Sequence, residues 1–120
     1  GRVVRGAAAD PVADIHVPDA VVTAAGARGV DPYDLINEAI RKAPPGANGV
    51  LFLPYMLGER TPLWNPNARG AFVGLNLASR REDLLRAVME GITMNLGIIV
   101  NIFRRHVPIE AMTVIGGGAK

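Results

Sequence analysis

Cysteine is absent from this chain of 120 residues. Its absence excludes disulfide bonds, thiolate metal sites and a cysteine nucleophile. It also fits a reducing compartment, so we expect a cytoplasmic protein. Aromatic residues are scarce as well: they make up 5% of the chain, against 49% for hydrophobic residues as a whole. A core built from this sequence must therefore be aliphatic.

A strong charge of either sign is also missing. The chain has 13 Lys and Arg against 11 Asp and Glu, and its formal net charge is +2. This surplus is too small to predict binding to nucleic acid, and no basic face with interleaved aromatic residues is present. The longest uncharged stretch of interest, residues 91–103, is shorter than a membrane span and contains two Asn and two Gly. We therefore expect no membrane partner and predict a buried helix there.

The length suits one domain or a piece of a larger one. Residues 1–24 show no hydrophobic period, so we expect loop with at most one short strand. A helix is predicted from Asp31, which can cap it, through Pro32 in its first turn, to the breaker "PPGANG". Its apolar positions share one face: Leu35, Ile36, Ala39 and Ile40.

Two strands and a long helix are predicted next. The apolar run 50–56 and the segment 70–77 have strand character, and a polar loop joins them. Residues 79–107 have the period of one long helix, with Ser79 as its expected cap and Glu82 at capping-box spacing. Residues 111–120 predict a third strand that runs into a glycine turn. The order of elements indicates an α/β layer arrangement.

Several polar residues are candidates for chemistry, and each has a structural alternative. Glu59 and Arg60 could bind a polyol or a phosphate, or form an ion pair that pins the loop. Trp64 could stack on a sugar or cover the core. Asp83 and Glu90, two helical turns apart, could act as acid and base or form salt bridges with Arg86 or Arg80.

The glycines at the end of the chain are the remaining candidates. Gly116, Gly117 and Gly118 follow the predicted third strand, where glycine lets the backbone approach a ligand closely. A flexible terminus is the alternative for these residues.

Residues 49–92, "GVLFLPYMLGERTPLWNPNARGAFVGLNLASRREDLLRAVMEGI", resemble the C-terminal lobe of the FGGY carbohydrate kinases, and within that family they are most similar to the xylulose kinases. The first half of the family's second signature is met by Gly70, Phe72, Gly74 and Leu75. The second half is met by Asp83, Leu84, Ala87, Val88, Met89 and Glu90. "VIGGGAK" is similar to the start of the family's adenosine-binding turn.

The resemblance implies an α/β fold: a fragment of an actin-like ATPase lobe of ribonuclease-H type with a long buried helix. Residues 25–120 would be part of the C-terminal, ATP-side lobe, truncated at the glycine turn. ATP with Mg²⁺ would donate its γ-phosphoryl group to a sugar hydroxyl, with D-xylulose giving D-xylulose 5-phosphate. Gly116, Gly117, Gly118 and Ala119 match nucleotide-contacting positions, and Glu59 and Arg60 are weaker substrate candidates.

The family's catalytic aspartate matches no residue of this chain, so we expect the chain alone to be inactive. The implied partners are a sugar, ATP and the remaining lobe of the same protein, with a second copy of the chain as a further candidate. Two alternatives stay open. One is a non-catalytic lobe that binds a nucleotide or a protein, and the other is a kinase for another polyol such as gluconate or glycerol.

Overall fold

The computed structural model describes residues 2–4, 15–17 and 19–115 of the chain. The chain divides into two compact units, one made of Gly1–Glu38 with Met112–Lys120 and the other of Ala39–Ala111.

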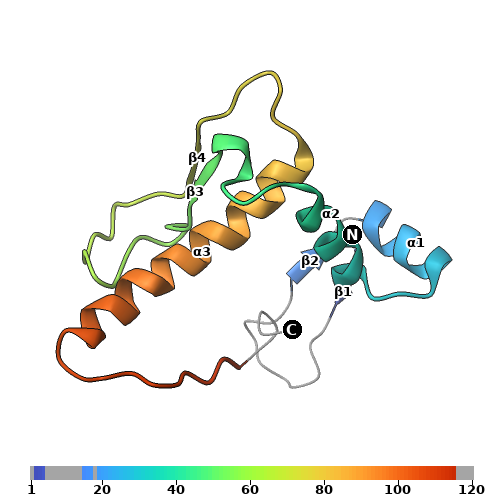
Figure 1. The fold of residues 1–120 in the computed structure, drawn as a ribbon. Coiled ribbons are helices and arrows are strands. Elements are labelled where there is room, and N and C mark those ends of the chain that lie inside the picture. The colour runs from blue at the N-terminus through green and yellow to red at the C-terminus, as the bar shows by residue number, and fades with distance from the viewer. Residues whose placement is uncertain (1, 5–14, 18, 116–120) are drawn as a thin grey trace. The chain divides into compact units, whose positions relative to one another are not determined.

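The first unit contains a short hairpin and a helix. Strands β1 (Arg2–Val4) and β2 (Ile15–Val17) pair antiparallel, with Val3 opposite His16. Helix α1 (Asp19–Arg28) follows (Figure 1).

Helix α1 corrects the expectation of loop for residues 1–24. Its segment "DAVVTAAGAR" has small apolar residues on every side, so no hydrophobic face marks it as a helix. Tertiary contact stabilises it instead, because Val21 and Ala25, one turn apart, are both buried. Sequence periodicity detects only helices that have one apolar and one polar face, and α1 is not such a helix.

Helix α2 (Pro32–Lys42) begins as predicted. The side chain of Asp31 accepts a hydrogen bond of 2.8 Å from the N–H of Tyr33, as an N-terminal cap does. Within the first unit, Arg28 donates two hydrogen bonds of 2.9 Å to the carboxylate of Glu38, and both side chains are about half exposed. The pKa of Arg28 is raised by its hydrogen bonds to Glu38 and by the charge of that carboxylate.

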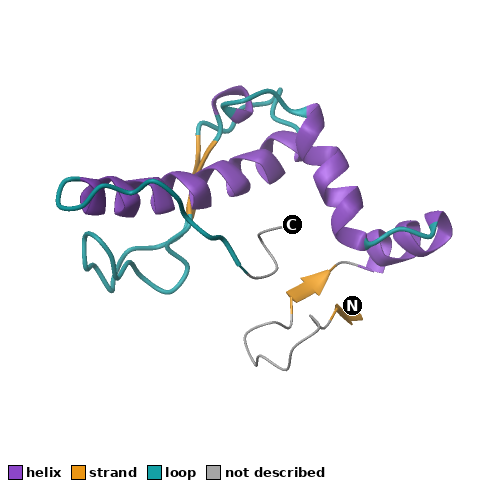
Figure 2. Ribbon diagram, turned by 60° about the horizontal axis from the view of Figure 1, so that its bottom comes forward, coloured by secondary structure: helices purple, strands orange, loops and turns teal. Residues whose placement is uncertain are grey.

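The second unit is a strand pair on a long helix. Strands β3 (Leu51–Leu53) and β4 (Ala71–Val73) are antiparallel, with Phe52 opposite Phe72 and their ring centroids 4.8 Å apart. Both predicted strands are thus present but shorter than expected. Helix α3 (Arg81–Arg104) lies against β3 and against the 3₁₀ turn η1 (Ala47–Gly49) (Figure 2).

The core of this unit is small and aliphatic, as the composition predicted. Ala47, Val50 and Ala87 are buried together, and Phe52 and Leu84 pack against them. One turn beyond Ala87, the helix approaches β3 so closely that a Cβ on Gly91 would overlap the carbonyl oxygen of Phe52. The close contact between α3 and β3 therefore requires glycine at position 91.

The start of α3 differs from the prediction. The helix begins at Arg81, and the N–H of Arg80 donates a hydrogen bond of 2.9 Å to the carboxylate of Asp83. Ser79, the expected cap, instead accepts a 3.0 Å hydrogen bond from the N–H of Asn76 and closes the preceding turn. A Ser can stabilise either a turn or a helix start, and here the carboxylate of Asp83 takes the second role.

The expectation of a buried helix is not confirmed in the part of the chain that the structure describes. Only Asp83, Ala87 and Gly91 are buried within α3. Seven large apolar residues of α3 are exposed. Met89, Ile92, Leu96 and Phe103 lie on its outer side, away from Ala87 and Gly91, whereas Met94, Ile98 and Ile102 continue the side of Ala87 and Gly91 further along the helix. By length and composition alone α3 could cross a membrane, but a core helix of a larger domain passes the same test.

The predicted third strand is absent from its described part. Residues 111–115 form neither helix nor strand and are exposed. A strand needs a neighbour whose backbone completes its hydrogen bonds, and the described residues offer none to this segment. Apolar composition alone predicted the strand, and composition does not supply that neighbour.

Candidate functional site

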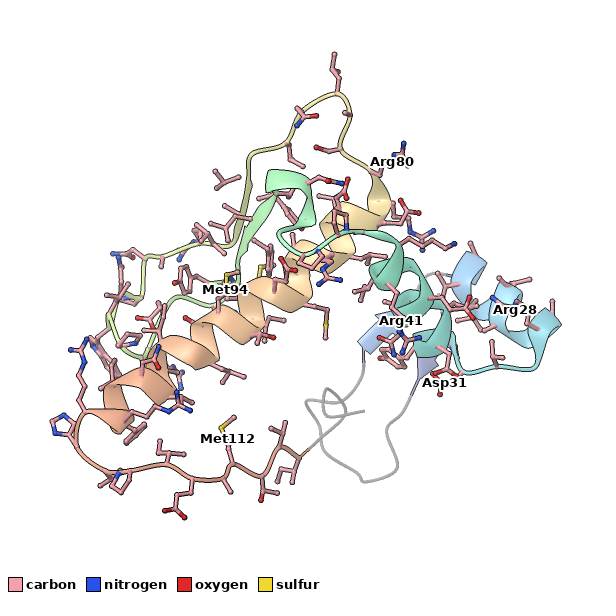
Figure 3. All side chains as sticks on the ribbon, viewed as in Figure 1. Arg28, Asp31, Arg41, Arg80, Met94 and Met112 are labelled. Atoms are coloured by element: carbon pink, nitrogen blue, oxygen red, sulfur yellow. The ribbon has the colours of Figure 1, made fainter. Side chains whose placement is uncertain are left out.

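A polar hollow of about 580 Å³ lies in the second unit, at the amino-terminal end of α3. Its wall combines the end of α2, the turn at η1 and the segment that leads into α3. Figure 3 marks Arg80, which stands at the start of the helix. The lining residues are Lys42, Ala43, Asn48, Asn76, Ala78, Ser79, Arg80, Glu82 and Asp83.

The turn that forms one wall has an unusual backbone. Gly46, Ala47, Asn48 and Gly49 all have positive φ angles, of 84°, 47°, 52° and 85°. Glycine adopts such angles freely, whereas in Ala and Asn they cost about 1–2 kcal/mol of conformational free energy each. Strain of this size persists only where surrounding contacts fix the backbone.

Two carboxylates of α3 provide those contacts. The carboxylate of Glu90 accepts the N–H of Gly46 at 3.1 and 3.2 Å, and Oδ1 of Asp83 accepts the side-chain amide of Asn48 at 2.8 Å. Asp83 and Glu90 are two helical turns apart and so project from the same side of α3. Their spacing, which was noted in the sequence, therefore positions a turn and gives no acid–base pair.

A salt bridge reinforces the contact at Glu90. Nε of Arg86 lies 2.7 Å from Glu90, and the same guanidinium donates a 3.2 Å hydrogen bond to the carbonyl of Ala43. This confirms the salt bridge expected between Glu90 and Arg86. The hydrogen bond from Arg86, aided by that from Gly46 and by the charge of Arg86, lowers the pKa of Glu90, against the opposing effect of burial.

The charges around the hollow cancel. Lys42 and Arg80 bring two positive charges, while Glu82 and Asp83 bring two negative ones. The N–H groups of Arg81 and Glu82, in the first turn of α3, have no partner among the described residues. The wall therefore carries no net charge and offers both hydrogen-bond donors and acceptors to a polar ligand.

Glu59, one of the two weaker substrate candidates, has a structural role. Its side chain is 5% exposed and accepts a 2.8 Å hydrogen bond from the N–H of Leu63. Its backbone pairs with Asn65 through two hydrogen bonds of 2.8 and 2.7 Å. Glu59 therefore pins the loop through backbone N–H groups, and the alternative of an ion pair with Arg60 is wrong.

Arg60 differs from its neighbour. It is exposed and makes no hydrogen bond or ion pair within the described part of the chain. Arg69, further along the loop, donates to the carbonyls of Pro66 and Ala68 at 3.1 and 2.8 Å. Arg60 is thus the loop residue whose guanidinium is available to a ligand.

Trp64 does not cover the core of this unit. It is 76% exposed, and its φ of 49° is rare for a bulky residue. The loop pinned by Glu59 therefore holds an exposed indole in a strained position.

The signature glycines have steric roles. A Cβ on Gly74, where φ is 87°, would overlap the carbonyl oxygen of Gly49. A Cβ on Gly70 would overlap the sulfur of Met56 and lie 3.2 Å from the carbonyl oxygen of Leu53. These glycines bring the strand β4 close to β3 and to the left-handed turn, so the signature maintains the wall of the hollow.

The four residues predicted to contact the nucleotide, Gly116, Gly117, Gly118 and Ala119, lie outside the described residues. Within the described ranges, no three His, Cys, Asp or Glu side chains are grouped so as to hold a metal ion. Proteins commonly hold Mg²⁺ through one or two carboxylates together with substrate phosphates and waters, so the expected Mg²⁺ stays a prediction.

Apart from Asp83, a candidate acid or base, the residues around the hollow were not predicted to form a site. The signal was present in "PPGANG", because Gly and Asn are the residues that accept positive φ. That segment was predicted only to end the helix before it. The polar partners lie 35 to 44 positions further along the chain, where no local pattern links them to the turn.

The sequence matches the C-terminal domain of the FGGY family of carbohydrate kinases over residues 7–120. A gluconokinase of Bacillus subtilis is 44% identical over 94 residues, which cover 77% of this chain. A xylulose kinase of Staphylococcus epidermidis is 48% identical over 92 residues, which cover 75% of this chain. The chain spans 18% of the length of each of these relatives.

Solved structures give the same grouping. The crystal structure of xylulose kinase from Bifidobacterium adolescentis matches with a TM-score of 0.66 at 39% identity. The match covers 85% of this chain and 20% of that protein.

Proposed function

Because this chain belongs to the FGGY family of carbohydrate kinases, we propose that the protein transfers the γ-phosphoryl group of ATP to a hydroxyl of a sugar. The observation that carries this proposal is the match over residues 7–120, together with the steric roles of the signature glycines. The likeness in sequence thus extends to the residues that keep the strands, turn and helix together. The proposal concerns the whole protein, since the chain spans 18% of its relatives.

Within this proposal, residues 25–120 are part of the ATP-side lobe. The neutral, hydrogen-bonding character of the hollow supports a role in holding the nucleoside part of ATP. Gly116, Gly117, Gly118 and Ala119 remain predicted nucleotide contacts because of the resemblance of "VIGGGAK" to the family's adenosine turn. Mg²⁺ is expected to enter with the phosphates, where it neutralises the charge that develops during transfer.

The proposed substrate is D-xylulose, with D-xylulose 5-phosphate as the product. The likeness to xylulose kinases in sequence and in structure supports it. Gluconate is the second candidate, because a gluconokinase is similar at a comparable level of identity. Sugar-contacting residues are not assigned, beyond Arg60, whose free guanidinium keeps it a weak candidate.

The test is a phosphorylation panel with the complete protein. ADP release is measured with ATP, Mg²⁺ and each of D-xylulose, D-ribulose, gluconate and glycerol. We expect kcat/KM for D-xylulose to exceed the others by at least about tenfold, the discrimination that one or two hydroxyl contacts supply. A preference for gluconate would make gluconate the substrate in place of D-xylulose. No ADP release with any sugar would contradict the kinase proposal.

Three further expectations belong to the proposal. The protein is expected in the cytoplasm, its other lobe is expected to cover part of this one, and a homodimer is its candidate assembly. Sedimentation of the complete protein tests the last of these.

A further inference from the structure

We propose that Asn48 contacts the nucleoside part of ATP through its side-chain carbonyl oxygen, and that Asp83 is the positioning residue that turns this oxygen toward the hollow. The inference rests on the proposed function, because it assigns the hollow to the nucleotide. It adds one contacting residue and one positioning residue.

The first step is the orientation of the amide. An ionised carboxylate can only accept hydrogen bonds, so the group of Asn48 that lies 2.8 Å from Asp83 must be its NH₂. The other oxygen of Asp83 is already engaged by the N–H of Arg80 at 2.9 Å. Asp83 is 1% exposed, so these two hydrogen bonds hold it in place.

The second step is what this orientation leaves free. With its NH₂ directed to Asp83, the carbonyl oxygen of Asn48 has no partner within the described part of the chain. Asn48 is exposed and lines the hollow. The wall of the hollow therefore presents a fixed hydrogen-bond acceptor, which selects a ligand group that donates, such as a ribose hydroxyl or an exocyclic amine.

The third step is the strain of the backbone. Asn48 has a φ of 52° within the left-handed turn, which the carboxylate of Glu90 holds at Gly46. The hydrogen bond from the NH₂ of Asn48 to Asp83 anchors this turn to α3 and accounts for a side chain at this position. The anchored turn also holds the carbonyl oxygen of Asn48 at a fixed place in the wall of the hollow.

The first experiment replaces Asn48 with glycine in the complete protein. Asn48→Gly removes the acceptor but suits the left-handed backbone, so the fold is expected to remain. We expect KM for ATP to rise about tenfold, as the loss of one good hydrogen bond predicts, with kcat and KM for the sugar within about twofold of wild type. Asn67→Gly is the matched control, because Asn67 is an exposed loop residue outside the hollow.

Nucleotide analogues identify the donor. KM is measured with ATP, 2′-deoxy-ATP, 3′-deoxy-ATP and inosine triphosphate, for wild type and for Asn48→Gly. With the analogue that lacks the group bound by Asn48, the two proteins are expected to have equal KM values. If Asn48→Gly changes KM for ATP by less than about twofold, or raises KM for the sugar instead, the inference is overturned.

The positioning role has a separate readout. Asp83→Asn places an NH₂ against one of the two donors, so it should also raise KM for ATP. In the Asn48→Gly background, the same substitution should add no further increase, because its effect passes through Asn48. Equal effects in both backgrounds would make Asp83 a merely structural residue. Absence of any sugar phosphorylation by wild type would instead contradict the proposed function, so the two failures are distinguishable.

Discussion

At the scale of single residues, three positions of α3 determine how the helix contacts the neighbouring turn and strand. Asp83 and Glu90 direct their carboxylates to the turn at residues 46–49, and Gly91 lets β3 approach the helix. The hydrogen bonds of Asp83 and Glu90 and the small size of Gly91 thus all help α3 to pack against the turn and β3. The residue type matters at each of these positions, and substitutions there have distinct expected costs.

Gly91→Ala is expected to destabilise the complete protein by about 1–3 kcal/mol, since the new methyl group must push β3 away from the helix. Gly97→Ala is the matched control, because a Cβ there meets nothing within 4 Å among the described residues. The control should be stabilising by about 0.5–1 kcal/mol, the helix-propensity difference between Gly and Ala. Urea unfolding of both variants measures the free energies, and equal values for the two would contradict the close packing at Gly91.

Glu90→Gln tests the lowered pKa of the carboxylate. A carboxylate with a depressed pKa in the folded state stabilises the fold above its ordinary pKa of 4.5, and this contribution is lost as the pH falls through the folded value. At pH 7 we expect the variant to be less stable than wild type by about 1 kcal/mol, the value of a charge-assisted hydrogen bond. The difference should shrink below the ordinary pKa.

Urea unfolding at about pH 7 and about pH 3.5 measures this difference. Glu110→Gln is the control, since Glu110 is exposed and makes no hydrogen bond within the described ranges. A stability difference that is the same at both pH values would show that the charge of Glu90 does not contribute.

At the scale of elements, the pinned loop between β3 and β4 holds Trp64 at a φ of 49°. Trp64→Gly should therefore stabilise the complete protein by about 0.5–1 kcal/mol, because relief of about 1–2 kcal/mol of left-handed strain exceeds the entropic cost of a glycine. Leu63→Gly is the matched control. Leu63 is 70% exposed, close to the 76% of Trp64, but its φ is not positive.

The control should lose about 0.5–1 kcal/mol through added freedom of the unfolded chain. Thermal unfolding of both variants gives the comparison. If Trp64→Gly proves the less stable of the two, the indole has a partner in the complete protein that outweighs the strain.

Elements with a clear period were predictable. Helix α2 was predicted with its cap at Asp31, and α3 and the two strands of the second unit were placed to within a few residues. Helix α1 was not, because its small residues give no polar face. The strand expected at residues 111–115 is not formed, since a strand depends on a neighbour that a local pattern does not reveal.

The site was less predictable than the fold. Glu59 and Arg60 stood out because they are adjacent charges, but Glu59 fixes its own loop. The hollow depends on contacts between Asn48 and Asp83, which are 35 positions apart. Such contacts follow from the approach of a turn to a helix, and the sequence shows them only once that approach is known.

At the scale of the whole molecule, the outer side of α3 is the main unsatisfied surface of the second unit. Four of the seven large apolar residues exposed on this helix lie on that side, including Leu96 at 52% and Phe103 at 58%. Exposed apolar surface of this extent marks an interaction site. Since the relatives are about four times as long as this chain, we expect the remainder of the kinase to cover it.

The 120-residue chain on its own should therefore self-associate and bind a hydrophobic dye, while the complete protein should not. Leu96→Lys with Phe103→Lys should reduce both effects in the isolated chain, because two charges now interrupt the apolar surface. In the complete protein the same pair should destabilise by about 1–3 kcal/mol per site, the cost of burying a polar group without a partner. Sedimentation, dye fluorescence and urea unfolding measure these outcomes. A monomeric isolated chain that binds no dye, or a complete protein unaffected by both lysines, would show that the outer side of α3 faces solvent in the kinase as well.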